Sequence, residues 1–62
     1  MDPVKVLQRA YQDELLDALR AGGAAQGVPY PHVRALLLEV GRRERAHAEA
    51  LAEALRRRGA PL

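Results

Sequence analysis

The chain of 62 residues contains no cysteine, serine, threonine, asparagine, tryptophan, phenylalanine or isoleucine. Without cysteine it can form neither a disulfide nor a thiolate metal site. Serine, threonine and cysteine nucleophiles are excluded too, as are P-loops ending in Ser or Thr. The chemistry of the protein must therefore come from two His, two Tyr, eight carboxylates and ten basic side chains.

Long apolar runs are also missing. No uncharged stretch approaches the ~18 apolar residues that a membrane-spanning helix needs, and Met1-Asp2-Pro3 does not resemble the start of a signal peptide. We therefore expect a cytoplasmic protein with no membrane partner. Its formal net charge of +2 is too small to define a partner by itself. Because a chain of this length buries only about 60% of its unfolded surface, we expect it to need a metal, self-association or both.

Two segments of the sequence have a helical pattern of apolar residues. Asp2 and Pro3 are typical of a helix start, and Gly59 and Pro61 of a helix end. The sequence predicts one unit over residues 1–62, with a helix at about 3–26, a turn at 27–30 and a helix at about 31–58. The end of the first helix is ambiguous, because Gly22-Gly23 could stop it after Ala21. The expected fold class is all-α, an antiparallel hairpin.

Charged residues interrupt the apolar arc of each helix. At ~100° per residue, Glu14 lies within the first arc, and Glu44 and His47 lie near the centre of the second. An unpaired charge in a core costs several kcal/mol, so buried carboxylates are normally paired or bound to metal. The arc of the first helix consists of Val4, Leu7, Tyr11, Leu15 and Ala18, and that of the second consists of Val33, Leu36, Leu37, Val40, Leu51, Ala54 and Leu55.

The two interruptions are at nearly the same height in the expected hairpin. If the first helix extends to Gln26, Glu14 lies about 18 Å from the turn and Glu44 about 20 Å beyond Pro31 on the way back, at 1.5 Å per residue. Because the two carboxylates would stand at nearly the same height, the sequence predicts a metal site of Glu14, Glu44 and His47. The Glu-x-x-His spacing alone is a weak signal. The alternative is a satisfied polar patch, such as a His47–Glu14 hydrogen bond that sets the register of a dimer.

The pattern resembles half of a known metal site. Glu14, followed thirty residues later by Glu44-Arg45-Ala46-His47, resembles the ferritin-like di-iron proteins of the rubrerythrin and bacterioferritin type. In those proteins a Glu and a Glu-x-x-His from successive helices occur twice around a four-helix bundle. The similarity extends over AYQDELLDAL and ERAHAEALAEALRRRG. The short chain is similar to the encapsulated ferritins, whose paired hairpins assemble the site between subunits.

The resemblance implies a homodimer or higher homo-oligomer in which two hairpins form a ferritin-like four-helix bundle. It also implies that Glu14, Glu44 and His47 bind iron and that Fe(II) is oxidised by O2. Mixed oxygen and nitrogen ligands suit Fe or Mn, and Zn nearly as well. The C-terminal segment of the encapsulated ferritins has no counterpart here, so an encapsulating shell is an unsupported partner.

Three other features leave alternatives open. Tyr11, one turn before Glu14, is either a second-shell hydrogen-bond donor to a ligand or a core residue. Gly41 is costly within a helix and either permits close helix approach or a local distortion. The rival functions are a structural dimerisation module without metal and a basic nucleic-acid-binding dimer. We disfavour nucleic acid because no aromatic platform accompanies the arginines and because glutamates are interleaved with them.

Overall fold

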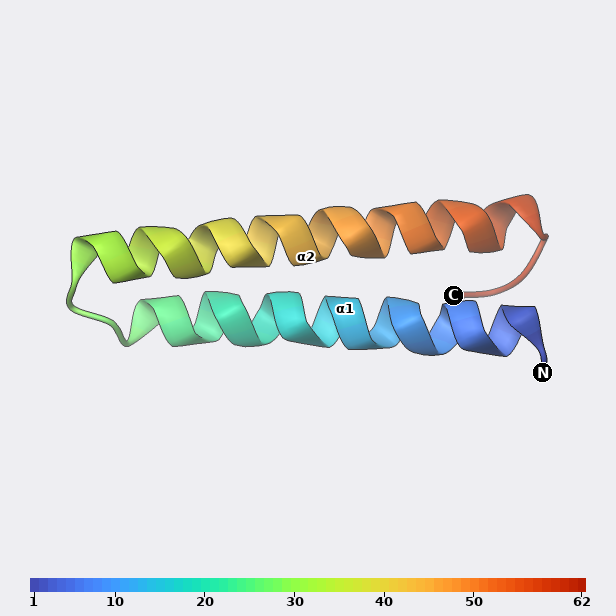
Figure 1. Cartoon of the computed structure of the whole chain (residues 1–62), viewed down its shortest axis with the longest axis horizontal. Coiled ribbons are helices and arrows are strands. Elements are labelled where there is room, and N and C mark those ends of the chain that lie inside the picture. The colour runs from blue at the N-terminus through green and yellow to red at the C-terminus, as the bar shows by residue number, and fades with distance from the viewer.

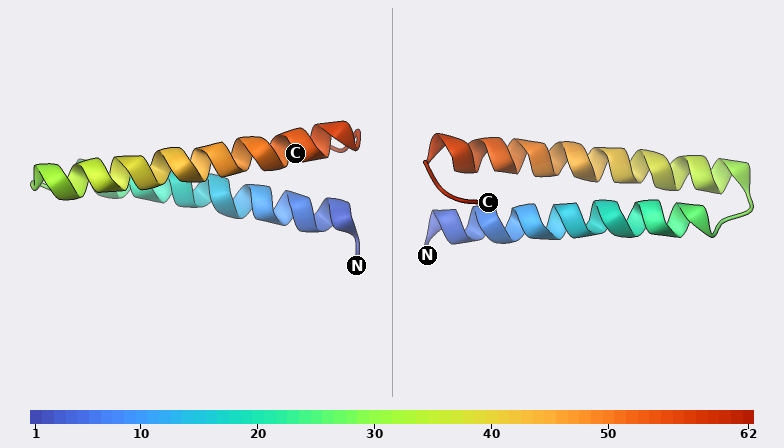
Figure 2. Two further views of the ribbon diagram at one scale, coloured as in Figure 1. Left: turned by 45° about the horizontal axis from the view of Figure 1, so that its top comes forward. Right: turned by 180° about the vertical axis from the view of Figure 1, so that it is seen from behind.

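The structure, a computed structural model, describes all 62 residues and contains two helices, α1 (Pro3–Gln26) and α2 (Pro31–Arg57). They run antiparallel and side by side, with the connecting turn at one end and both termini at the other (Figure 1). The two views of Figure 2 show the same elongated hairpin. The chain is therefore all-helical, as the sequence predicts, and contains no strand. Neither helix combines the length and apolarity needed to cross a membrane.

The start of α1 follows from its first residues. A carboxylate oxygen of Asp2 accepts a hydrogen bond from the backbone N–H of Val4 at 2.9 Å, and Pro3 occupies the first turn. The helix then continues through Gly22-Gly23 and ends at Gln26, where the N–H of Gly27 reaches back to carbonyls of the last turn. A stop after Ala21 is therefore wrong. The five additional residues, about 1.4 turns, bring Glu14 level with Glu44.

The turn and the open end of the hairpin are both tied by hydrogen bonds. At the turn, Nε of Arg34 donates to the carbonyl of Val28 at 3.2 Å. At the open end, Gly59 has φ +67°, and the N–H of Ala60 donates to the carbonyl of Leu55 at 3.0 Å, as in a Schellman motif. The chain then folds back over α1 (Figure 1), where Gln8 donates to the carbonyl of Pro61 at 2.8 Å. The C-terminal tail thus closes the end of the hairpin.

The core of the hairpin is small, with only five buried residues, and four of them are alanines. Only Leu55 contributes a large, fully buried side chain. Each helix presents its contact residues at alternating spacings of three and four, the pattern of a coiled-coil seam. Glu14 and Glu44 occupy positions in these two seams. The buried residues are Ala18, Ala25, Ala48, Ala52 and Leu55.

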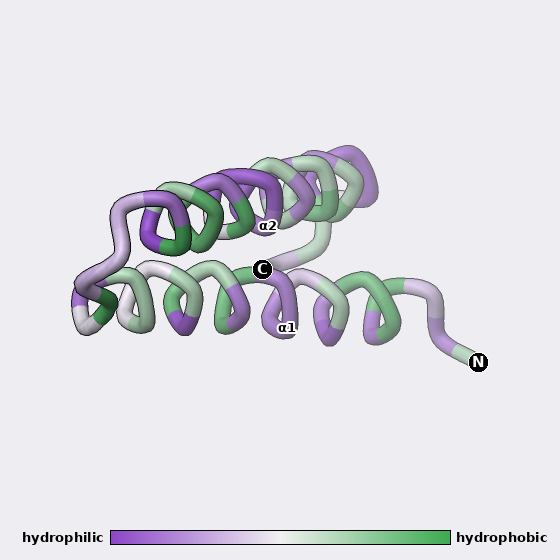
Figure 3. Tube along the Cα trace, turned by 60° about the vertical axis from the view of Figure 1, so that its left-hand side comes forward, coloured by the Kyte–Doolittle hydropathy of each residue, from purple (hydrophilic) through white to green (hydrophobic).

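Three apolar residues of α2 that the sequence assigns to the core are exposed in the hairpin. Val33 is 46% exposed, Leu36 63% and Val40 38%. The wheel explains the difference, because these residues point roughly 60–120° to one side of the direction in which Ala48 and Leu55 meet α1. Both helices carry hydrophilic and hydrophobic residues in alternation along their length (Figure 3). We call the strip of Val33, Leu36 and Val40 the open face.

Candidate metal centre

Glu14 from α1 and Glu44 and His47 from α2 converge midway along the hairpin. One ligand atom from each of the three side chains lies within 4.8 Å of the others. The seam positions of Glu14 and Glu44 aim both carboxylates between the helices, while His47 is one turn further along α2. The structure therefore brings together the three side chains that the sequence selects. Two carboxylates and an imidazole are a donor set that suits divalent transition-metal ions.

The cluster opens to one side of the hairpin. Nδ1 of His47 lies 3.4 Å from Oε2 of Glu14, but the imidazole side chain is 66% exposed and that of Glu14 only 29%. His47 therefore does not point into the hairpin core, contrary to its place at the centre of the predicted arc. On the wheel it lies on the same side of α2 as Val40 and Leu36. The carboxylates of Glu14 and Glu44 lie in the seam between the helices, and the imidazole of His47 lies beside the open face.

One oxygen of the cluster lacks a hydrogen-bond donor. Oε2 of Glu14 is buried and makes no hydrogen bond of acceptable geometry within the hairpin. Buried polar atoms are normally satisfied, and a charged acceptor left without a donor is especially costly. A cation, a proton held by a neighbouring carboxyl group, or a small movement of the imidazole of His47, whose Nδ1 lies 3.4 Å away, would satisfy this oxygen. The orphaned atom therefore fits a metal ligand.

The neighbouring carboxyl group of Glu44 holds its proton more tightly than an ordinary glutamic acid does. Its pKa is raised above the ordinary value of 4.5, first because it can share a hydrogen bond with the carboxyl of Glu14. Partial burial and the negative charges of Glu14 and Asp17 act in the same direction, whereas His47 lowers the pKa. A proton and a metal cation would thus stabilise the same pair of carboxyl groups, so that they compete for it.

Tyr11 lies half-buried on α1, one turn before Glu14. Its hydroxyl makes no hydrogen bond to another group of the hairpin. Its place on the seam is compatible with the core role, and the second-shell role stays a prediction.

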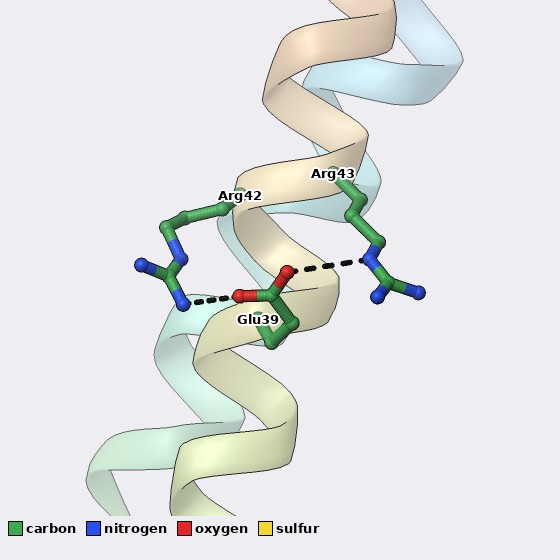
Figure 4. Close-up of polar contacts among 3 residues, drawn as sticks. All are labelled: Glu39, Arg42 and Arg43. Carbon is green, nitrogen blue, oxygen red and sulfur yellow. Dashed lines mark hydrogen bonds and ion pairs between the residues drawn. The ribbon is translucent and has the colours of Figure 1, made fainter.

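The arginines of α2 are largely paired with glutamates of the same helix. Glu39 lies between Arg42 and Arg43 and forms an ion pair with each of them, the second at 3.3 Å (Figure 4). Glu53 pairs in the same way with Arg56 at 3.2 Å and Arg57 at 3.3 Å. Such exposed pairs add at most about 1 kcal/mol each to stability. They do offset the positive charge that a nucleic-acid-binding surface would need.

No motif in the sequence marks Asp17 as a site residue, although its negative charge contributes to the raised pKa of Glu44. It follows Glu14 by three residues and therefore lies on a neighbouring part of the same helical surface. In the sequence, this three-residue spacing is the only feature that links Asp17 to the candidate site. Its significance depends on the distance across to α2, which the sequence alone does not provide.

No protein-family model, characterised protein or solved structure matches this chain. The resemblance to ferritin-like proteins therefore rests on the residues and spacing of the candidate site, and membership of that superfamily stays a prediction.

Proposed function

We propose that this chain is a cytoplasmic, ferritin-like metal-binding protein that holds divalent ions with Glu14, Glu44 and His47. The observation that carries the proposal is the convergence of three ligand atoms within 4.8 Å around a buried oxygen of Glu14 that accepts no hydrogen bond of acceptable geometry. In a purely structural polar patch, a donor hydrogen on Glu44 or on Nδ1 of His47, 3.4 Å away, would satisfy that oxygen instead. A bound cation supplies the missing positive charge.

The proposed functional unit is a homodimer forming a four-helix bundle. One hairpin offers only two carboxylates and one imidazole and leaves His47 66% exposed. The adjoining residues of the open face are apolar and also uncovered. A second copy on this face would bury Val33, Leu36 and Val40 and add a second set of three ligands. The four ligand carboxylates would then balance the charge of two divalent ions.

Iron is the ion that the resemblance favours, with Mn or Zn as further candidates because their ligand preferences overlap. Bound iron would supply redox chemistry with O2, so oxidation of Fe(II) is the activity we propose. The protein's own part is to hold the ions through oxygen and nitrogen ligands and to compensate their charge. The second copy would keep bulk water from the site by covering its exposed side.

The proposal is tested by metal titration of chelator-treated protein, with the oligomeric state followed by sedimentation. We expect one ion per chain for Mn²⁺, Co²⁺ or anaerobic Fe²⁺, and a shift from monomer to dimer as the ions bind. Glu44→Ala should abolish binding. Glu49→Ala is the matched control, because Glu49 is exposed on the same helix and forms no ion pair. Full binding by Glu44→Ala would sink the proposed site.

The second candidate function is a helical dimerisation module without metal, which the open face alone would support. It predicts that the dimer is equally stable in excess EDTA. It also predicts that Glu44→Ala leaves the dimer unchanged or stabilises it through better packing. The same sedimentation experiment, repeated with EDTA, therefore separates the two functions.

A further inference from the structure

Asp17 lies at the edge of the proposed metal site. It follows Glu14 by three residues on α1, so its side chain points about 60° away from that of Glu14 and towards the side on which His47 is exposed. Asp17 does not belong to the group of ligand atoms within 4.8 Å of one another. Its negative charge nevertheless acts on the carboxyl group of Glu44 across the helix pair. Asp17 thus lies on the side of the hairpin to which the site opens, without being one of its direct ligands.

The carboxylate of Asp17 is only loosely held. Its nearest cation, Nη1 of Arg20, lies 3.8 Å from Oδ1, with side chains 53% exposed for Asp17 and 69% exposed for Arg20. Asp13, one turn earlier on the same helix, provides a contrast. There Nε of Arg9 donates a hydrogen bond to Oδ1 at 3.3 Å, so this carboxylate already has a donor. The oxygens of Asp17 remain available as acceptors.

We propose that Asp17 is the fourth residue of each half-site and its third acidic one, a positioning residue that accepts a hydrogen bond from a water molecule on the bound cation. This inference rests on the proposed metal-binding function. Three direct ligands from one hairpin do not fill an octahedral shell, and hard divalent ions readily retain water. A water bound to a cation is a strong donor, and a carboxylate is its best acceptor. Asp17 would orient that water beside Glu44.

The test uses the full chain and Mn²⁺, with Asp17→Asn compared with Asp13→Asn. Both changes remove one negative charge from α1, and both residues are exposed. Loss of an outer-sphere hydrogen bond typically lowers metal affinity by about 10- to 100-fold, which we expect for Asp17→Asn. The Asp13→Asn change should alter Kd much less, because the carboxylate of Asp13 is paired with Arg9 and is not among the charges that act on Glu44.

A second readout follows the water itself. Oxygen-17 relaxation measures the exchange rate of water bound to Mn²⁺, and we expect faster exchange in Asp17→Asn than in Asp13→Asn. Equal affinities and exchange rates for the two variants would overturn the role of Asp17 while leaving the metal site intact. An affinity difference that vanishes at 1 M salt would also overturn it, because it would reveal only a long-range charge effect. If the unmodified chain binds no Mn²⁺, Co²⁺ or Fe²⁺, both proposals fail.

Discussion

The two halves of α2 differ in how far the rest of the hairpin buries their apolar side chains. Towards the C-terminus, Ala48, Ala52 and Leu55 are buried against α1, and the tail closes this end. Towards the turn, Val33 and Leu36 are exposed although they continue the same apolar arc. The candidate metal site lies at the junction of the halves. The terminal half thus holds the only large buried side chain of the hairpin, whereas the turn half leaves large apolar side chains uncovered.

The largest effect on stability should come from a substitution in the half of α2 nearer the C-terminus. Leu55 is 0% exposed and is the only large side chain that is fully buried. We expect Leu55→Ala to lower the free energy of unfolding by about 2–5 kcal/mol, enough to unfold much of the metal-free protein. Urea unfolding followed by circular dichroism measures this. Leu36→Ala, at a residue 63% exposed, should cost the metal-free monomer no more than about 0.5 kcal/mol. Equal losses would refute the division of α2.

The next effect concerns the proposed dimer and not the monomer. A charge placed on the open face, as in Leu36→Glu, should weaken dimerisation at least tenfold, or about 1.4 kcal/mol, because an unpaired carboxylate would be buried between hairpins. Leu38→Glu is the control. Leu38 is 49% exposed but points to the other side of the α1 contact. Sedimentation equilibrium in the presence of Mn²⁺ gives both dissociation constants. If only Leu38→Glu disrupts the dimer, the partner occupies the opposite face.

A smaller effect should appear in the pH dependence of the metal-free protein. The pKa of Glu44 in the hairpin is raised above 4.5, so the folded state holds its proton more tightly than the unfolded state does. The stabilisation from this group is complete below about pH 4.5 and is lost as pH rises through the raised pKa. Glu44→Gln cannot lose a proton and should not show this loss. Thermal unfolding in EDTA measures the difference, and identical pH profiles for the two proteins would contradict the shared-proton account.

If the proposed site binds metal, added metal should reverse the sign of that pH dependence. Cations bind the deprotonated carboxylates and the neutral imidazole, so the stabilisation gained from Mn²⁺ should grow as pH rises from acid to neutral. The pH at which added metal begins to raise Tm therefore marks the competition between proton and cation at Glu14 and Glu44.

The sequence predicts those parts of the structure that depend on local chemistry and counting. Asp2, Pro31 and Gly59 mark helix ends because capping and backbone geometry are local. Counting residues from the turn puts Glu14 and Glu44 at one height. The sequence does not reveal which part of the broad apolar arc of α2 faces α1, because some residues of that arc point towards α1 and others towards the open face. Consequently His47 is exposed where a core position was expected, and two buried alanines, Ala48 and Ala52, give too weak an apolar signal to be recognised.

The smallest effect concerns Gly41, which lies in the seam between α1 and α2, near the middle of α2. A Cβ there would lie 3.5 Å from the carbonyl oxygen of Ala18 and 3.6 Å from Cβ of Ala21, both ordinary contacts. The hairpin therefore does not require glycine for close approach. Because glycine within a helix costs up to about 1 kcal/mol relative to alanine, we expect Gly41→Ala to stabilise the metal-free hairpin by up to that amount.

Urea unfolding in EDTA measures the gain, with Gly23→Ala as the control because a Cβ at Gly23 meets nothing within 4 Å. Both variants should be stabilised if the single hairpin is the whole structure under these conditions. A loss at Gly41 alone would show that α1 approaches α2 more closely in solution than these contacts allow, because the added Cβ points at Ala18 and Ala21 of α1. A gain at Gly41 in EDTA that turns into a loss in Mn²⁺ would show that metal binding draws α1 and α2 closer together at this level. That pattern would explain why a residue unfavourable to α2 stands one turn before Glu44.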